Sequence, residues 1–249
     1  MTTKMSRRRR SVLAGMCAGL GSAALAPAGA ADSADEQRLH TDWPFLRRYA
    51  DENAALRAGG TPVDAVFLGD SITEGWLSKA PAFFTPGRVC RGIGGQTTPQ
   101  MLLRFRQDVI DLRPAMVHIM GGTNDIAGNT GPSTLQMVQD NYLGMTDIAM
   151  ANHVHLIFAS IPPAHDFPWR PGLDTRTPIA ALNEWLQDHA RRVHATYANY
   201  FAVLADGEGG MRRGLASDGV HPTEEGYALM RPVAEAALKQ AAGLHRLGR

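Results

Sequence analysis

Cysteine is scarce in this chain of 249 residues, which contains only Cys17 and Cys90. Cys17 lies in an N-terminal segment that we expect to be removed from the mature protein. Cys90 would then be the sole thiol, so no disulfide can form within the mature chain. The roughly 219 residues that follow position 30 are still enough for one hydrophobic core without covalent cross-links.

The sequence also lacks a long uninterrupted apolar run. Its N-terminal apolar stretch ends near Ala26 and is interrupted by glycines, at positions 15, 19 and 21. A permanent membrane span needs about 20 apolar residues, so this stretch would make a poor one. We therefore expect no stable membrane span after this segment is cleaved.

The same segment has the three parts of a signal peptide. The arginines Arg7–Arg10 precede the apolar stretch, and Ala28-Gly29-Ala30 has the small-x-small pattern of a cleavage site. Two adjacent arginines followed by a serine and two apolar residues are typical of a twin-arginine signal. We predict a twin-arginine signal peptide over 1–30, a single domain over 31–249, and a periplasmic or secreted location.

An excess of basic charge is absent as well. The chain has 25 Lys and Arg against 24 Asp and Glu, a formal net charge of +1. Five of the basic residues and none of the acidic ones lie in the first 30 positions, so the mature chain has 20 against 24, a net charge of −4. This balance does not indicate the basic surface of a nucleic-acid-binding protein, and we expect no nucleic-acid partner.

Helical and extended patterns alternate along the rest of the chain. Strands are predicted at residues 63–68, 88–93, 115–120, 154–160 and 200–204. Helices are predicted at residues 33–59, 99–112, 133–152, 178–197 and 223–242, with an irregular loop at 162–176. Strands separated by helices predict an α/β fold, in which a parallel sheet of about five strands lies between two layers of helices.

The stretch from Val63 to Gly75 is the first candidate for chemistry. Its apolar residues favour a buried strand that ends at Gly69, and the next two residues, Asp70 and Ser71, are both common helix N-caps. A serine at this corner would lie at the carboxyl edge of the sheet, near helix amides that stabilise negative charge. On this stretch alone, a simple capping role explains Ser71 equally well.

Glycine and polar residues also follow later predicted strands. Residues 92–98 are Gly-Ile-Gly-Gly-Gln-Thr-Thr, Asn124 follows Gly121-Gly122, and Asp218 stands three residues before His221. Each group alone has a structural explanation, such as an Asx turn or a helix cap. Together they offer a nucleophile, a base, an orienting carboxylate and oxyanion donors, which is the set that acyl transfer needs.

In four blocks, at residues 67–75, 90–98, 121–125 and 218–221, the chain resembles the SGNH (GDSL) hydrolases, in their acetylhydrolase- or esterase-like branch. The resemblance implies a flavodoxin-like three-layer α/β/α fold, no metal or cofactor, and hydrolysis of esters or thioesters. One departure is Cys90, since the family often has asparagine before its second block.

The same resemblance implies a role for each matching residue. Ser71 would be the nucleophile, His221 the base and Asp218 its orienting partner. The oxyanion hole would consist of the Ser71 amide, the Gly95 amide and the Asn124 side chain. The choice between Gly94 and Gly95 stays open, because both stand in the block.

For the substrate we expect a short-chain acyl ester, in particular an acetyl ester, on a small molecule or a glycan. The loop at 162–176 has few large aliphatic residues, and its Trp169 and Arg170 are candidates for substrate binding. Three alternatives stay open: a lysophospholipase- or thioesterase-type lipid acylhydrolase, a non-catalytic carbohydrate-binding protein, and a metal-dependent phosphoesterase. The metal site of that last class would comprise four residues: Asp70, Asp125, Asp218 and His221.

Overall fold

The computed structural model describes residue 37 and residues 40–247, and it contains a sheet of five parallel strands. The chain divides after His40 into two units, and the architecture below belongs to the second, Thr41–Arg249. The strands, in the spatial order β2-β1-β3-β4-β5, are β1 (Ala65–Gly69), β2 (Arg88–Gly92), β3 (Met116–Met120), β4 (His155–Ala159) and β5 (Thr196–Ala198). The predicted signal peptide at 1–30 lies outside the described residues.

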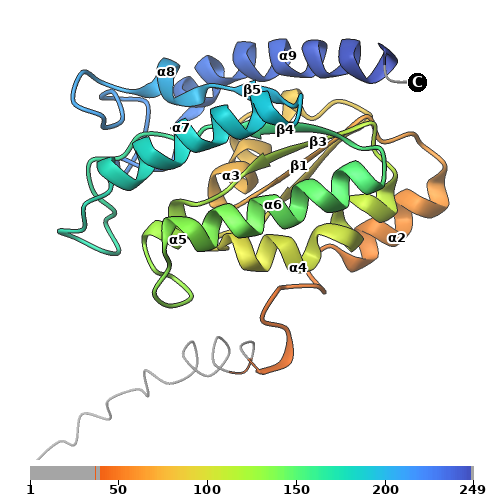
Figure 1. Cartoon of the computed structure of the whole chain (residues 1–249), viewed down its shortest axis with the longest axis horizontal. Helices are drawn as coiled ribbons and strands as arrows, with labels where there is room; N and C mark the ends of the chain where they lie inside the picture. Colours follow the sequence, from red (N-terminus) through yellow and green to blue (C-terminus); the bar gives the residue numbers. More distant parts are fainter. Residues whose placement is uncertain (1–36, 38–39, 248–249) are drawn as a thin grey trace, which may run out of the picture. The chain divides into compact units, whose positions relative to one another are not determined.

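Helices cover both faces of this sheet, as Figure 1 shows. The layer on one face consists of α2 (Ala50–Gly59), α4 (Thr98–Asp108), α6 (Leu135–Ala151) and α7 (Arg176–Arg192). The other layer consists of α3 (Ser71–Lys79), α8 (Tyr200–Leu204) and α9 (Glu224–Leu247). Three short elements complete the fold: η1 (Pro81–Phe83), η2 (Ile110–Leu112) and α5 (Thr123–Ile126). The predicted three-layer α/β/α fold is therefore confirmed.

An aromatic cluster fixes α3 and α9 to the sheet. The Trp76 ring of α3 is fully buried, stacks on Phe83 at 4.4 Å, and meets Phe67 of β1 edge-on at 6.1 Å. Tyr227 of α9 lies against the other side of this cluster, 5.5 Å from Trp76, and its hydroxyl donates to the Ile72 carbonyl. Burial of large aromatic rings contributes much of a core's free energy, so the start of α3 is firmly positioned.

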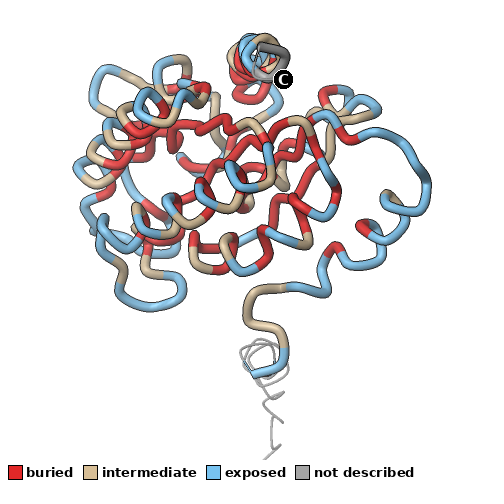
Figure 2. The backbone as a smooth tube through the Cα atoms, turned by 45° about the vertical axis from the view of Figure 1, so that its right-hand side comes forward, coloured by how far each residue is buried: buried red, intermediate tan, exposed pale blue. Residues whose placement is uncertain are grey.

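The strands are buried along most of their length, whereas the helices alternate between buried and exposed turns (Figure 2). The register aligns the carboxyl ends of the central strands, because Gly69 of β1 pairs with both Gly92 of β2 and Met120 of β3. The loops that follow these strands therefore meet at one edge of the sheet, where open α/β folds bind their ligands. None of the described helices is both long and apolar enough to cross a membrane.

The predicted strand at 200–204 is wrong, because those residues form helix α8. The fifth strand is β5, which overlaps the last two residues of the helix predicted at 178–197; α7 ends earlier, at Arg192. His194 adopts a positive φ of 55° that turns the chain back to the sheet. Asn199 then caps α8, since its side chain accepts a hydrogen bond from the Ala202 amide.

The single helix predicted at 33–59 is interrupted: residues 37, 40 and 41 are helical, but α2 begins only at Ala50. Residues 42–49 form turns instead, and Phe45 has a positive φ of 60° that a helix does not allow. The carboxylate of Asp42 accepts hydrogen bonds from the amides of Leu46 and Arg47 and stabilises these turns. The other four predicted strands lie within two residues of the observed ones.

Candidate active site

Ser71 is the first residue of α3, directly after the turn that ends β1. Asp70 caps this helix, because its carboxylate accepts a hydrogen bond of 2.9 Å from the Ile72 amide. Gly69 is required at the turn, since a Cβ there would lie 2.0 Å from the Thr73 hydroxyl oxygen and 2.8 Å from the Met120 carbonyl oxygen. The close approach of strand and helix therefore places Ser71 at the carboxyl edge of the sheet.

The structure brings Ser71, His221 and Asp218 together in one chain of contacts. The Ser71 hydroxyl oxygen lies 2.9 Å from His221 Nε2, and His221 Nδ1 lies 2.7 Å from Asp218 Oδ2. Ser71 and His221 are 150 residues apart in sequence. The contact therefore depends on the loop between Met211 and Glu224 lying over the start of α3.

Asp218 holds His221 through the backbone as well as through the ring. Its Oδ1 accepts hydrogen bonds from the amides of His221 at 2.8 Å and Val220 at 3.0 Å, while Oδ2 faces the imidazole. Burial raises the pKa of the Asp218 carboxyl, but these hydrogen bonds outweigh it and hold the pKa below its ordinary value. Asp218 is thus an anion suited to accept from Nδ1, which leaves Nε2 as the acceptor that faces Ser71.

The contacts of the glycine loop after β2 distinguish Gly94 from Gly95. The Gly94 amide donates to the Glu74 carboxylate at 2.8 Å, and the same carboxylate pairs with Arg48 at 3.3 Å. Gly95 has a positive φ of 74°, and its amide donates to no acceptor among the described residues. Gly95 therefore has the amide that remains open to a ligand.

The Asn124 side chain is buried and is held at both of its ends. Its Nδ2 donates to the Gln96 carbonyl at 3.0 Å, and its Oδ1 accepts from Asn129 Nδ2 at 2.8 Å. An NH₂ group has two hydrogens, so one N–H of Asn124 stays available beside the Gly95 loop. The sequence-predicted oxyanion residues thus lie around one edge of the sheet.

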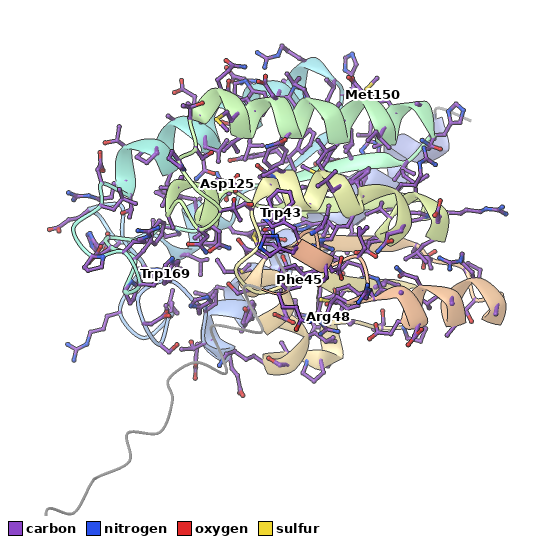
Figure 3. All side chains as sticks on the ribbon, turned by 90° about the horizontal axis from the view of Figure 1, so that it is seen from below. Trp43, Phe45, Arg48, Asp125, Met150 and Trp169 are labelled. Atoms are coloured by element: carbon purple, nitrogen blue, oxygen red, sulfur yellow. The ribbon has the colours of Figure 1, made fainter. Side chains whose placement is uncertain are left out.

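Trp169 lies beside His221, with 5.9 Å between the ring centroids. The indole stacks on the buried Phe167 at 5.2 Å and is 38% exposed, while its Nε1 donates to Asn129. Arg170 instead directs its guanidinium toward the Gly128 carbonyl, at 3.4 Å. Figure 3 shows Trp169 toward the left of the view and Met150 of α6 toward the upper right.

The carboxylates proposed for a metal-dependent phosphoesterase are engaged in other contacts. Asp125 accepts from the Thr98 hydroxyl at 2.6 Å and the Thr98 amide at 3.0 Å. Burial raises the pKa of Asp125, and it raises the pKa of Asp70 to about 6 against the opposing effect of the hydrogen bond from the Ile72 amide. In the part of the chain that the structure describes, no three His, Cys, Asp or Glu side chains are grouped to hold a metal ion.

Cys90 lies in β2, and its side chain contacts the backbone of α3. Its thiol is buried and donates to the Thr73 carbonyl of α3 at 3.4 Å. Burial raises the pKa of the thiol to about 11, so Cys90 stays protonated and supports the helix that begins at Ser71.

Three residues that contact the site were not predicted from the sequence: Glu74, Arg104 and Asn129. Arg104 is fully buried below the loops, where it donates to the Gly69 carbonyl at 2.9 Å and pairs with Asp108 at 3.0 Å. The signal that could have identified Arg104 is its place on the buried face of an amphipathic helix, because a charged side chain there needs polar partners.

The match to a known family runs through this whole site. A family model described as the GDSL-like lipase/acylhydrolase family matches residues 67–229. A GDSL-like lipase from Bacteroides thetaiotaomicron is 40% identical, with a TM-score of 0.76, over 80% of this chain and 100% of that one. A Bacteroides fragilis protein described as an acylhydrolase is also 40% identical, with a TM-score of 0.76, over 80% of this chain and 98% of its own.

Two further matches are more limited. A mutant of Axe2, an acetyl-xylooligosaccharide esterase from Geobacillus, is 18% identical over 72% of this chain and 95% of its own, with a TM-score of 0.54, which is a likeness of fold alone. The uncharacterized lipoprotein YqeF of Bacillus subtilis is 58% identical over 36 residues, which are 14% of this chain and 15% of that protein. The family match covers all four blocks around the site, and the chain belongs to the GDSL-like lipase/acylhydrolase family.

Proposed function

We propose that this protein is a serine esterase in which Ser71 is the nucleophile, His221 the general base and Asp218 the residue that orients the base. The observation that carries this proposal is the continuous contact chain, 2.9 Å from Ser71 to His221 and 2.7 Å from His221 to Asp218. A binding protein needs no such chain, whereas a hydroxyl nucleophile needs a base within hydrogen-bond reach. The family membership supports hydrolysis of an ester as the reaction.

The reaction has two halves. His221 Nε2 accepts the hydroxyl proton of Ser71 as the serine oxygen attacks the ester carbonyl, and the imidazolium then gives that proton to the departing alcohol. Water next attacks the acyl-enzyme, with His221 again accepting the proton and returning it to Ser71 as the acid leaves. In both tetrahedral intermediates the negative oxygen accepts hydrogen bonds from the Ser71 amide, the Gly95 amide and Asn124 Nδ2.

The proposed substrates are short-chain acyl esters, acetyl esters above all, with a carbohydrate as the alcohol. The exposed face of Trp169 supports a sugar, because it lies next to His221, where the departing alcohol receives its proton. The name of Axe2 shows that this fold can host an acetyl-xylooligosaccharide esterase. Such a role suits a periplasmic or secreted protein, the location that the N-terminal segment predicts.

The experiment compares hydrolysis of p-nitrophenyl acetate, butyrate and octanoate by the purified protein, followed by acetate release from acetylated xylooligosaccharides, all with a chelator present. We expect the highest kcat/KM for the acetate and release of acetate from the oligosaccharides. The highest kcat/KM for octanoate would favour a lipid acylhydrolase instead. Loss of all activity with the chelator would favour metal-dependent chemistry.

Replacing Trp169 by alanine tests the sugar site. Because the exposed indole face would be lost, we expect KM for acetylated xylooligosaccharides to rise about tenfold, equivalent to about 1.4 kcal/mol. KM for methyl acetate, which has no sugar ring to stack, should change little. Leu173→Ala, at another exposed apolar residue of the same loop, is the matched control. An unchanged KM for every ester tested would exclude Trp169 from substrate binding.

A further inference from the structure

Asn129 lies in the loop after α5 and contacts three parts of the site that are far apart in sequence. Its Nδ2 donates to Asn124 Oδ1 at 2.8 Å and lies 3.4 Å from the Gly95 carbonyl oxygen. Its Oδ1 accepts from Trp169 Nε1 at 3.1 Å. One exposed amide therefore joins an oxyanion donor, the glycine loop and the loop beside His221.

The direction of these hydrogen bonds follows from the indole. A Trp Nε1–H can only donate, so Asn129 must present its oxygen to Trp169 and its NH₂ to the interior. Asn124 must then present its oxygen to Asn129, which leaves its own NH₂ for the Gln96 carbonyl and for the open space beside Gly95. The Gln96 carbonyl, which can only accept, fixes Asn124 in the same sense, so the donor character of Trp169 reinforces this orientation through the Asn129 amide.

The loop that carries Asn129 is held in place on both sides. The Thr130 hydroxyl contacts the Thr97 hydroxyl at 2.9 Å, and Arg170 reaches the Gly128 carbonyl. The backbone N–H of Asn129 also donates to the backbone carbonyl of Asn124 at 3.0 Å. Asn129 can therefore hold the Asn124 side chain in place before the substrate binds, as electrostatic preorganisation requires.

We propose that Asn129 is a positioning residue that transmits the orientation of the Trp169 indole to Asn124 and keeps the Asn124 N–H directed at the oxyanion. The inference rests on the proposed esterase function. Without Asn129, the Asn124 side chain is held only by the Gln96 carbonyl, and its free N–H can turn away from the negative oxygen. A misdirected Asn124 amide has an effect only when the oxyanion forms, so the change lowers kcat and leaves KM unchanged.

A double-mutant cycle between Asn129→Ala and Asn124→Ala tests this relation with p-nitrophenyl acetate. Asn124→Ala should lower kcat by about 10²- to 10³-fold, the usual effect of one oxyanion donor. Asn129→Ala should lower kcat by about 10- to 100-fold, because a misdirected donor is less harmful than an absent one, with KM within about twofold. In the Asn124→Ala background the same substitution should have no further effect.

Trp169→Phe is a second variant that keeps the aromatic ring and removes only the indole N–H. We expect its kcat to fall about 3- to 10-fold, since the amides lose their fixed direction, while KM stays unchanged. Asn199→Ala is the matched control, because Asn199 is also exposed and also loses one side-chain hydrogen bond, to the Ala202 amide at the start of α8. Its kcat should equal that of the wild type.

The outcomes separate this inference from the proposed function. If Asn124→Ala lowers kcat but Asn129→Ala and Trp169→Phe do not, the relay is overturned and the esterase assignment stands. An equal loss from Asn129→Ala in both backgrounds would indicate a general structural role and would also overturn the relay. Full activity of Asn124→Ala would remove the oxyanion assignment, and the relay with it.

Discussion

Replacing Ser71 by alanine should lower kcat for p-nitrophenyl acetate by about 10⁴- to 10⁶-fold, the range seen when a serine hydrolase loses its nucleophile. Among the described residues, no hydroxyl other than that of Ser71 lies within hydrogen-bond distance of His221 Nε2. The backbone amides of the oxyanion hole stay intact in the variant, so a small residual rate above that of water is expected. Initial rates with purified proteins at matched concentration measure the effect.

Ser78→Ala is the matched control for this variant. Ser78 lies on the same helix, and its hydroxyl donates to the Gly75 carbonyl at 2.9 Å without contacting the site. Its kcat should stay at the wild-type value. Residual activity of Ser71→Ala above about one per cent, at least roughly a hundred times more than expected, would show that another group attacks the ester.

Asp218→Asn should lower kcat by about 10³- to 10⁴-fold, close to the known effect of this change in a serine protease triad. An asparagine can present its NH₂ to His221 Nδ1, which favours the tautomer with the proton on Nε2. That nitrogen can then no longer accept the Ser71 proton. KM should stay nearly unchanged, because Asp218 acts on the ring and not on the bound ester.

A second Asp–His pair in this chain supplies the control. His165 Nε2 lies 2.9 Å from Asp206 Oδ2, a distance like that of the proposed pair, but among the described residues neither His165 nor Asp206 contacts Ser71. Asp206→Asn should therefore leave kcat unchanged. If Asp206→Asn and Asp218→Asn reduced kcat equally, the assignment of Asp218 as the orienting residue would be wrong.

The location of the site could be predicted because of one property of parallel sheets. Every loop that follows a strand lies at the same edge, so Ser71, Gly95 and Asn124 could be grouped from strand predictions that were accurate to two residues. His221 was placed at the same edge because its loop follows the segment 200–204, which was predicted to be a strand but forms helix α8. The roles of these residues in catalysis stay predictions until they are measured.

The errors in the predicted fold have a common cause. The segment Tyr200–Leu204 is rich in residues that favour strands, but Tyr200 and Leu204 are four positions apart and both are buried on one side of α8. Spacing over five residues cannot separate these two possibilities. The short strand β5, which pairs with β4 at only three positions, gave no signal comparable to the longer strands.

The site residues that could not be predicted from the sequence owe their roles to contacts between segments that are far apart in the chain. The choice of Gly95 over Gly94 requires the carboxylate of Glu74, 20 residues earlier, to occupy the Gly94 amide. Asn129 stands before Thr130 and Gly131, which reads as a turn, and its role emerges only when Trp169, 40 residues later, donates to it. No local pattern encodes the direction of such hydrogen bonds.

The most direct test of the central claim is covalent trapping of the nucleophile. The protein is incubated with a p-nitrophenyl alkylphosphonate ester, digested and analysed by mass spectrometry. The account predicts release of one equivalent of p-nitrophenol, loss of esterase activity and a single phosphonyl adduct on Ser71. It also predicts no adduct in Ser71→Ala. An adduct on a different residue that abolishes activity, or full esterase activity in a protein whose Ser71 is modified, would contradict the account.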